Sequence, residues 1–231
     1  MKAIVTGATK GIGRAITLAL AGQGYDLGIG ARNLEEMDYL RKEIMSIYPD
    51  LEVITKSADF SRKYETTNFA ETFINYWGDI DVLVNNVGVY EEDELDNISE
   101  EQLMYMLNIN FLSAFRLTQP FIPEFKRRKR GHIINVCSVL SKKVRRQAVS
   151  YTLTKQMLYT YTKVLRSELR NYDVKVTAIL PGSTNTSSWE GLDAPVEDFV
   201  QPKDVADGVV LALTSNGMVE ELEIKPVNPK L

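Results

Sequence analysis

The segment Ser-Tyr-Thr-Leu-Thr-Lys-Gln, residues 150–156, contains two side chains that could exchange a proton. Tyr151 and Lys155 are four positions apart, so in a helix they lie on one face. An ammonium held beside a phenol favours the phenolate and lowers the pKa of the phenol. The spacing therefore indicates either proton transfer or the ordinary surface patterning of a helix, and other parts of the chain must decide.

A glycine-rich motif, TGATKGIG, follows the first apolar stretch at residues 6–13, with glycines at Gly7, Gly11 and Gly13. Glycines let the backbone approach phosphate groups, and the N-terminus of the next helix offers free N–H groups and a positive dipole end. It is not a Walker A loop, because no Gly-Lys-Ser/Thr follows at the required spacing. The motif predicts a pyrophosphate site; the alternative is a tight turn that binds nothing.

The end of the second apolar stretch, Gly30-Ala31-Arg32-Asn33, indicates which dinucleotide is bound. An acidic residue there would bond an adenosine ribose and favour NAD. Arg32 instead suits a 2′-phosphate, and Lys10 in the glycine loop adds a second cation on the same side. We therefore predict NADP(H), the alternative being that Arg32 only caps a surface turn.

The elements that must position these residues alternate along the chain. Short apolar, β-branched runs are separated by longer stretches of helical period, as expected for parallel strands covered on both faces. This alternation predicts a single doubly wound α/β domain over residues 1–231, with a mostly parallel seven-stranded sheet and ligands at the carboxyl ends of its strands. The predicted strands lie at 2–6, 25–31, 51–56, 81–86, 132–137, 174–180 and 221–227.

Helix boundaries have their own signals. Ser99 and Gln102 form a capping-box pattern that opens a helix. Pro120 and Pro123 are expected to end or kink that helix, and Pro202 fits the first turn of the last one.

Composition excludes several classes of protein. The chain of 231 residues is 44% apolar and 25% charged, with a net charge of −4, whereas a general nucleic-acid binder would be basic. Its one cysteine, Cys137, cannot form an internal disulfide, and one histidine with one cysteine makes a poor metal site, so we predict no metal. No stretch has the length of a signal peptide or membrane span, so we expect a cytoplasmic protein that does not bind membranes.

Taken in order, the motifs resemble those of the short-chain dehydrogenase/reductase family, from Met1 to about Asp207. The resemblance rests on TGATKGIG (6–13), Asp59 in SADF, NNVG (85–88), Asn110 in NIN, Ser138 in VCS, YTLTK (151–155) and PGSTNT (181–186). Each motif alone is weak, but the ordered set is specific. It implies a Rossmann-fold oxidoreductase.

The resemblance also implies residue roles. Asn110, Ser138, Tyr151 and Lys155 match the family's catalytic tetrad. Asp59 would contact the adenine, and residues after the sixth strand would hold the nicotinamide carboxamide. The full set of expected cofactor-binding residues is Gly7, Thr9, Lys10, Gly11, Ile12, Gly13, Arg32, Asp59, Phe60, Asn86, Gly88, Tyr151, Lys155, Pro181, Gly182, Thr184 and Thr186.

Ketone reduction needs a hydride and a proton for the emerging alkoxide. We expect Tyr151 to be the general acid and Lys155 to lower its pKa and bind the nicotinamide ribose. Ser138 would donate a hydrogen bond to the carbonyl oxygen. Asn110 would position a water that relays protons to Lys155.

Two departures from the family pattern concern assembly and substrate. Val87 replaces the usual alanine of Asn-Asn-Ala-Gly. The ending VEELEIKPVNPKL replaces the common glycine-rich tail and, with PGSTNTSSWEG (181–191), is more similar to the bacterial sepiapterin-reductase-like branch. A homodimer is then at least as consistent as a homotetramer.

The substrate is left open among a pteridine-like diketone, a 3-oxoacyl thioester on an acyl carrier protein, and small ketones. A basic loop, residues 142–146, would attract an anionic substrate or is only a solvated surface. Residues 186–199 resemble the family's substrate lid, in which Trp189 closes over substrate or anchors the lid. The rival from another class is a regulator that senses NADPH without turnover.

Overall fold

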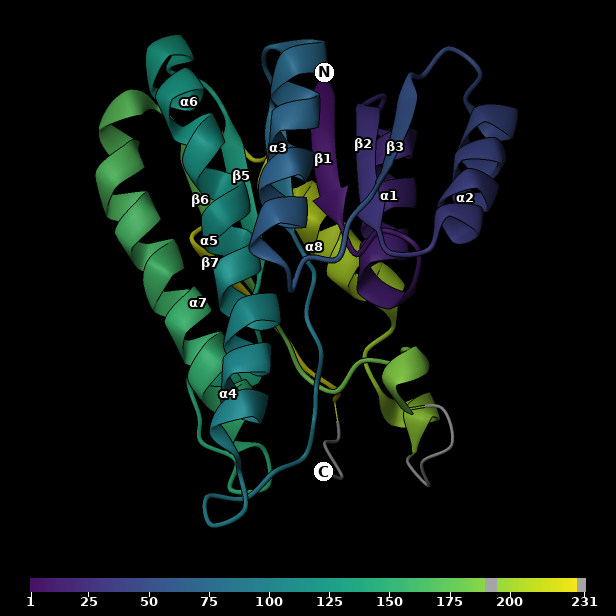
Figure 1. Ribbon diagram of the computed structural model, residues 1–231. Coiled ribbons are helices and arrows are strands. Elements are labelled where there is room, and N and C mark those ends of the chain that lie inside the picture. The colour runs from purple at the N-terminus through teal and green to yellow at the C-terminus, as the bar shows by residue number, and fades with distance from the viewer. Residues whose placement is uncertain (190–194, 228–231) are drawn as a thin grey trace.

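The computed structural model, which describes residues 1–189 and 195–227, contains one sheet in which every pairing is parallel (Figure 1). Within those residues the sheet has seven strands in the order β3-β2-β1-β4-β5-β6-β7. Their bounds are β1 (Lys2–Thr6), β2 (Asp26–Ala31), β3 (Val53–Ser57), β4 (Val82–Asn85), β5 (His132–Val136), β6 (Lys175–Pro181) and β7 (Glu221–Ile224).

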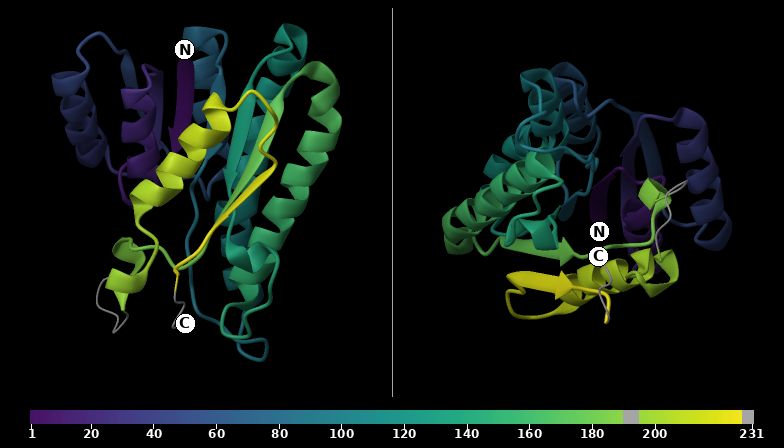
Figure 2. Two further views of the ribbon diagram at one scale, coloured as in Figure 1. Left: turned by 180° about the vertical axis from the view of Figure 1, so that it is seen from behind. Right: turned by 90° about the horizontal axis from the view of Figure 1, so that it is seen from below.

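Helices cover both faces of this sheet (Figure 2). On one side α1, α2 and α8 pack over the first apolar cluster, and on the other α3, α5, α6 and α7 pack over the second. Their bounds are α1 (Gly11–Gly22), α2 (Leu34–Ile47), α3 (Lys63–Trp77), α4 (Glu100–Leu107), α5 (Ser113–Thr118), α6 (Ile122–Arg128), α7 (Val149–Leu169) and α8 (Pro202–Thr214).

The two-sided covering explains why the central strands are apolar at nearly every position. Ile4 and Leu83 point to the cluster under α3, whereas Val5 and Val84 point to the cluster under α1. All four side chains are fully buried. Each methylene removed from water contributes on the order of 0.8 kcal/mol, so a strand buried on both faces needs no polar alternation.

The strand order places the ligand crevice. Chain order reverses between β1 and β4, and in doubly wound sheets the crevice opens at the carboxyl ends of the strands on either side of that reversal. Here those ends lead into the glycine loop and the Asn-Asn motif. The predicted fold class is thus confirmed, with a fully parallel sheet in place of a mostly parallel one.

The structure agrees with the predicted helix boundaries, apart from local differences at Gln102 and Pro120. Ser99 accepts the N–H of Gln102 at 3.1 Å, while the Gln102 amide donates to Glu91 at 3.4 Å and not back to Ser99. Pro120 lies in a 3₁₀ turn after α5, and the chain then continues as α6. Pro202 begins α8 as predicted. We find no helix, among the described residues, with the length and hydropathy of a membrane span.

Candidate active site

The glycine loop has backbone geometry that side chains would block. Gly7 and Gly11 adopt positive φ values of 64° and 49°, a region that favours glycine. A Cβ on Gly13 would lie 2.0 Å from the carbonyl oxygen of Gly7, so the start of α1 sits directly against the loop. Lys10 is the N-cap of α1, and within the described chain its side chain does not cap the helix. The first N–H groups of α1 are therefore available to an anion such as a pyrophosphate.

Asn86 fastens this loop to the neighbouring strand. Its amide donates to the carbonyl oxygens of Thr6 at 2.9 Å and of Gly7 at 3.2 Å, and its own N–H donates to the Thr6 hydroxyl at 3.1 Å. Asn86 thus spans the reversal between β1 and β4 and shapes the floor of the crevice. A Cβ on Gly7 would approach the Val87 side chain to 3.3 Å, so the Val87 substitution lies at the same wall.

The loop after β2 carries the residues predicted to select the cofactor. Burial acts to raise the pKa of the Asp59 carboxyl, but hydrogen bonds from Ser61 and the charges of Arg62 and Arg32 lower it overall. Arg32 is exposed and makes the smallest of these contributions. Lys10 is not a free cation, because its Nζ pairs with Glu36 at 2.9 Å. Sequence analysis missed Glu36; the signal was an acidic first turn in α2.

The other predicted cofactor residues differ in accessibility. Phe60 is buried in an edge-to-face contact with Phe69, at 5.1 Å between ring centroids, so only its main chain can face a nucleotide. Ile12 is partly buried against the core. Pro181 ends β6, and the N–H of Gly182 donates to the carbonyl oxygen of Ile224 at 2.8 Å.

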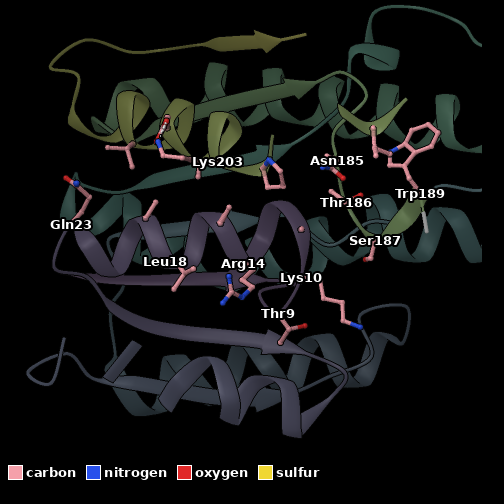
Figure 3. Close-up of a pocket in the computed structure, with 18 residues that line it drawn as sticks. Thr9, Lys10, Arg14, Leu18, Gln23, Asn185, Thr186, Ser187, Trp189 and Lys203 are labelled. Atoms are coloured by element: carbon pink, nitrogen blue, oxygen red, sulfur yellow. Dashed lines mark hydrogen bonds and ion pairs between the residues drawn. The ribbon is translucent and has the colours of Figure 1, made fainter. Parts of the chain in front are cut away.

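A cavity of about 1050 Å³ joins the glycine loop to the segment after β6 (Figure 3). Four predicted cofactor residues, Thr9, Lys10, Gly11 and Thr186, are among its lining residues, and a Cβ on Gly11 would meet Thr186 at 2.9 Å. The cavity continues between α1 and α8, away from Tyr151. It therefore includes the phosphate end of the predicted site and not the catalytic end.

Trp189 makes two contacts at the predicted lid. Its indole N–H donates to the carbonyl oxygen of Thr184 at 3.0 Å, and its ring lies 4.9 Å from that of Phe199. Thr184 lies two residues before the predicted lid and Phe199 is its last residue, so these contacts favour the anchoring alternative. Residues 190–194 of this segment lie outside the described residues.

The catalytic candidates converge at the start of α7. Tyr151 and Ser138 share a hydrogen bond that acts to lower the Tyr151 pKa, and the Lys155 Nζ lies 5.7 Å from the centroid of the Tyr151 ring. Lys155 is 3% exposed and donates to the carbonyl oxygen of Val136 at 2.9 Å. The three side chains come from the end of β5 and the first two turns of α7.

Electrostatics differ from the sequence-based expectation that Lys155 lowers the Tyr151 pKa. Burial raises the pKa of Tyr151 to about 12 and lowers the pKa of Lys155 to about 8. Desolvation is the largest cause in both cases, because it disfavours the charged form of each group, and the hydrogen bond with Ser138 offsets only part of it for Tyr151. At neutral pH, Tyr151 therefore holds its proton and Lys155 still carries most of its charge.

Asn110 lies in a π-helical turn, Asn108–Leu112, a feature common at functional sites. Its side chain accepts the N–H of Val89 at 2.8 Å and donates to the Val89 carbonyl at 3.0 Å and the Thr154 hydroxyl at 3.2 Å. A Cβ on Gly88 would come within 3.1 Å of both Asn110 and Lys155. Asn110 thus binds the strand-four loop to the catalytic helix, while its predicted water relay stays a prediction.

Two further residues of this loop lie at the site and were missed from sequence. The Tyr90 ring meets the Tyr151 ring edge-to-face at 5.0 Å, and Asp93 is a buried carboxylate at the start of α7. Both come from the irregular segment between β4 and α4, which has no periodicity to place its side chains.

With this geometry in hand, comparison with known proteins identifies the family. The short chain dehydrogenase family matches residues 1–196. The chain belongs to the short-chain dehydrogenase family. An uncharacterized oxidoreductase of Staphylococcus epidermidis is 31% identical over 227 residues, covering 97% of this chain and 96% of that protein. Another, from Staphylococcus saprophyticus, is 29% identical, with 97% coverage of both chains.

Solved structures of short-chain dehydrogenases share this fold. An alcohol dehydrogenase from the archaeon Thermococcus sibiricus, complexed with 5-hydroxy-NADP, is 28% identical with a TM-score of 0.90, covering 100% of this chain and 99% of that one. A metagenomic short-chain oxidoreductase in complex with NADP is also 28% identical, with a TM-score of 0.85 and coverage of 99% and 98%. This short-chain dehydrogenase is therefore an oxidoreductase with the fold of these enzymes.

Proposed function

We propose that this short-chain dehydrogenase is an NADPH-dependent carbonyl reductase that converts a ketone to an alcohol. The observation that carries the proposal is the placement of the half-buried Tyr151 phenol, which shares a hydrogen bond with Ser138 and has the Lys155 ammonium 5.7 Å from its ring centroid. A phenol in that position has its proton available for an alkoxide forming against Ser138.

Each chain residue then has a defined part in the reaction. Ser138 binds the carbonyl oxygen and stabilises the negative charge that develops there. Tyr151 gives its proton to that oxygen, and Lys155 stabilises the phenolate that results. NADPH, when bound, supplies the hydride. Asn110 keeps the loop and helix that surround the reacting oxygen in register.

The residues present fit this cofactor. The glycine loop brings backbone N–H groups into the open at the start of α1, and Arg32 lies exposed where an adenosine 2′-phosphate would be paired. Two of the similar solved structures were determined with NADP or a hydroxylated NADP. The Lys10–Glu36 pair leaves Arg32 as the principal cation for the phosphate.

The substrate class is the finer part of the proposal. A pteridine-like diketone is favoured by the likeness of the C-terminal segment to sepiapterin-reductase-like enzymes. The basic loop gives less support to a thioester on an acidic carrier protein, because two of its cations are paired. Lys142 contacts Glu221 at 2.6 Å, and Arg145 contacts Glu92 at 3.7 Å.

Turnover separates this proposal from a non-catalytic NADPH sensor. A sensor needs only phosphate and ribose contacts and has no use for a hydrogen-bonded Ser138–Tyr151 pair beside Lys155. We expect NADPH oxidation with at least one member of a panel containing sepiapterin, small diketones and a 3-oxoacyl thioester. Tight NADPH binding with no oxidation across the panel would favour the sensor.

Arg32 is the residue with which cofactor choice can be tested. Arg32→Asp should lower kcat/KM for NADPH by roughly a hundredfold and leave NADH use unchanged or improved, because a charge-assisted pair is replaced by like-charge repulsion. Arg41→Asp, at an exposed position on α2, is the matched control and should leave the preference as it is. Equal NADPH use by wild type and Arg32→Asp would exclude Arg32 as the phosphate ligand.

A further inference from the structure

Helix α7 carries both Tyr151 and Lys155, yet its own N-cap residue provides no cap. Ala148 occupies that position and has no side-chain oxygen to accept a hydrogen bond. Thr152 makes the first helical bond, to the Ala148 carbonyl at 2.9 Å. The N–H groups of the residues before it need partners from elsewhere, as at any helix start.

Asp93, distant in sequence, provides those partners. One carboxylate oxygen accepts the N–H of Val149 at 2.5 Å and that of Ser150 at 3.2 Å. The other accepts the Ser150 hydroxyl and, at 3.3 Å, the Ser150 N–H. Asp93 is 5% exposed, so these bonds are shielded from water, and its negative charge lies at the positive end of the helix dipole.

Asp93 also fastens its own segment to the helix. Its N–H donates to the Gln147 carbonyl at 3.1 Å, and it forms a parallel bridge with Ala148. The other end of the segment is held where Asn110 binds both main-chain groups of Val89 and contacts Thr154 on α7. Residues 89–93 are thus tied to the catalytic helix at both ends.

Between these two attachments lies Tyr90. Its ring contacts the Tyr151 ring at 5.0 Å with an interplanar angle of 73°, and its hydroxyl donates to Glu92 at 3.3 Å. Glu92 in turn pairs with Arg145, which lies in the loop just before α7. The position of Tyr151 therefore depends on two contacts: the cap of the first turn of α7 by Asp93, and the ring of Tyr90.

We propose that Asp93 is a positioning residue for the reaction: it caps the catalytic helix from outside and presses Tyr90 against Tyr151. This inference rests on the proposed function. Tyr151 is the third residue of α7, so fraying of the first turn would move the phenol while Lys155, one turn later, stays in place. Displacements of about 1 Å at a reacting group can cost up to about a hundredfold in rate.

The test compares Asp93→Ala with Asp93→Asn. Alanine removes every acceptor, whereas asparagine keeps one oxygen and is as good an N-cap as aspartate. We expect Asp93→Ala to lower kcat by about tenfold to a hundredfold with KM and NADPH affinity nearly unchanged. Asp93→Asn should recover kcat to within about threefold of wild type. Equal losses in both variants, or unchanged kcat in Asp93→Ala, would overturn the proposal.

A second measurement does not depend on activity. Hydrogen exchange should show faster exchange of amides 149–152 in Asp93→Ala, with the rest of α7 protected as in wild type; unchanged exchange there would overturn the cap. If Asp93→Ala does not fold, Ser150→Ala takes its place and should show the same pattern with a smaller loss of kcat. Glu94→Gln removes an exposed carboxylate from the next position and should match wild type in both measurements. A wild type inactive on every carbonyl would refute the proposed function, while the exchange data still decide the cap.

Discussion

Tyr151→Phe is expected to lower kcat for ketone reduction by about a thousandfold while leaving NADPH affinity within about twofold of wild type. The variant loses only the hydroxyl that shares a hydrogen bond with Ser138, and its ring can keep the edge-to-face contact with Tyr90. Stopped-flow NADPH oxidation measures the chemical step, and quenching of protein fluorescence measures binding.

The matched control is Tyr161→Phe, on the same helix, whose hydroxyl accepts a hydrogen bond from Gln119 outside the site. It should retain wild-type kcat. If Tyr151→Phe kept more than a tenth of wild-type activity, another group would have to be the proton donor, and the assignment of Tyr151 would be abandoned.

Lys155→Met should abolish turnover and stabilise the fold at the same time. Methionine approximates the length of the lysine side chain without its charge. Activity falls because the phenolate of Tyr151 loses its neighbouring cation, and NADPH binds more weakly if Lys155 also contacts the ribose. Stability rises because the buried ammonium, with a pKa of about 8 against an ordinary 10.5, costs on the order of 3 kcal/mol at pH 7.

The sign of the pH dependence follows from the direction of this shift. The folded pKa of Lys155 is below the unfolded one, so between about pH 8 and 10.5 the unfolded chain binds more protons than the folded chain. The free energy of unfolding of the wild type should therefore increase as pH rises through that window, because the cost of burying the Lys155 charge is removed. The stability difference between Lys155→Met and wild type should narrow by roughly 2 kcal/mol from pH 7 to 9.5.

Urea unfolding at the two pH values measures this difference. If the difference in unfolding free energy between Lys155→Met and wild type stayed constant with pH, Lys155 would not have the lowered pKa that its burial implies. In the same window, reduction by wild type should slow above about pH 8, because neutral Lys155 no longer stabilises the phenolate. Lys163→Met, on the same helix with its ammonium over the Tyr159 ring, is the control and should show neither effect.

Local patterns in the chain were sufficient to predict the fold and the family. Near-continuous apolar runs predicted all seven strands to within three residues at each end, because strands buried on both faces cannot carry polar alternation. Glycines at 7, 11 and 13 predicted the tight turn into α1, since backbone at positive φ and close contact admit little else. Comparison with known proteins confirms the family prediction.

The pKa values of the catalytic side chains could not be predicted from the sequence. The i, i+4 spacing of Tyr151 and Lys155 shows that they are neighbours, not how far each is removed from water. Desolvation raises the pKa of Tyr151 and lowers the pKa of Lys155, and the tyrosine shift is opposite to the one that a solvated pair would show. The sequence likewise predicted that Lys10 was available to a phosphate, whereas in the structure its ammonium pairs with Glu36.

The order of elements, the glycine loop and the residues that could transfer a proton were all predictable from the amino-acid sequence, because each follows from short-range spacing and backbone sterics. The surroundings of these residues depend on contacts between distant parts of the chain. Asp93 reaches the start of α7 from more than fifty positions earlier in the chain, through a segment without periodicity. A helix that lacks its own cap needs acceptors from wherever the chain folds back, and no local pattern specifies that return.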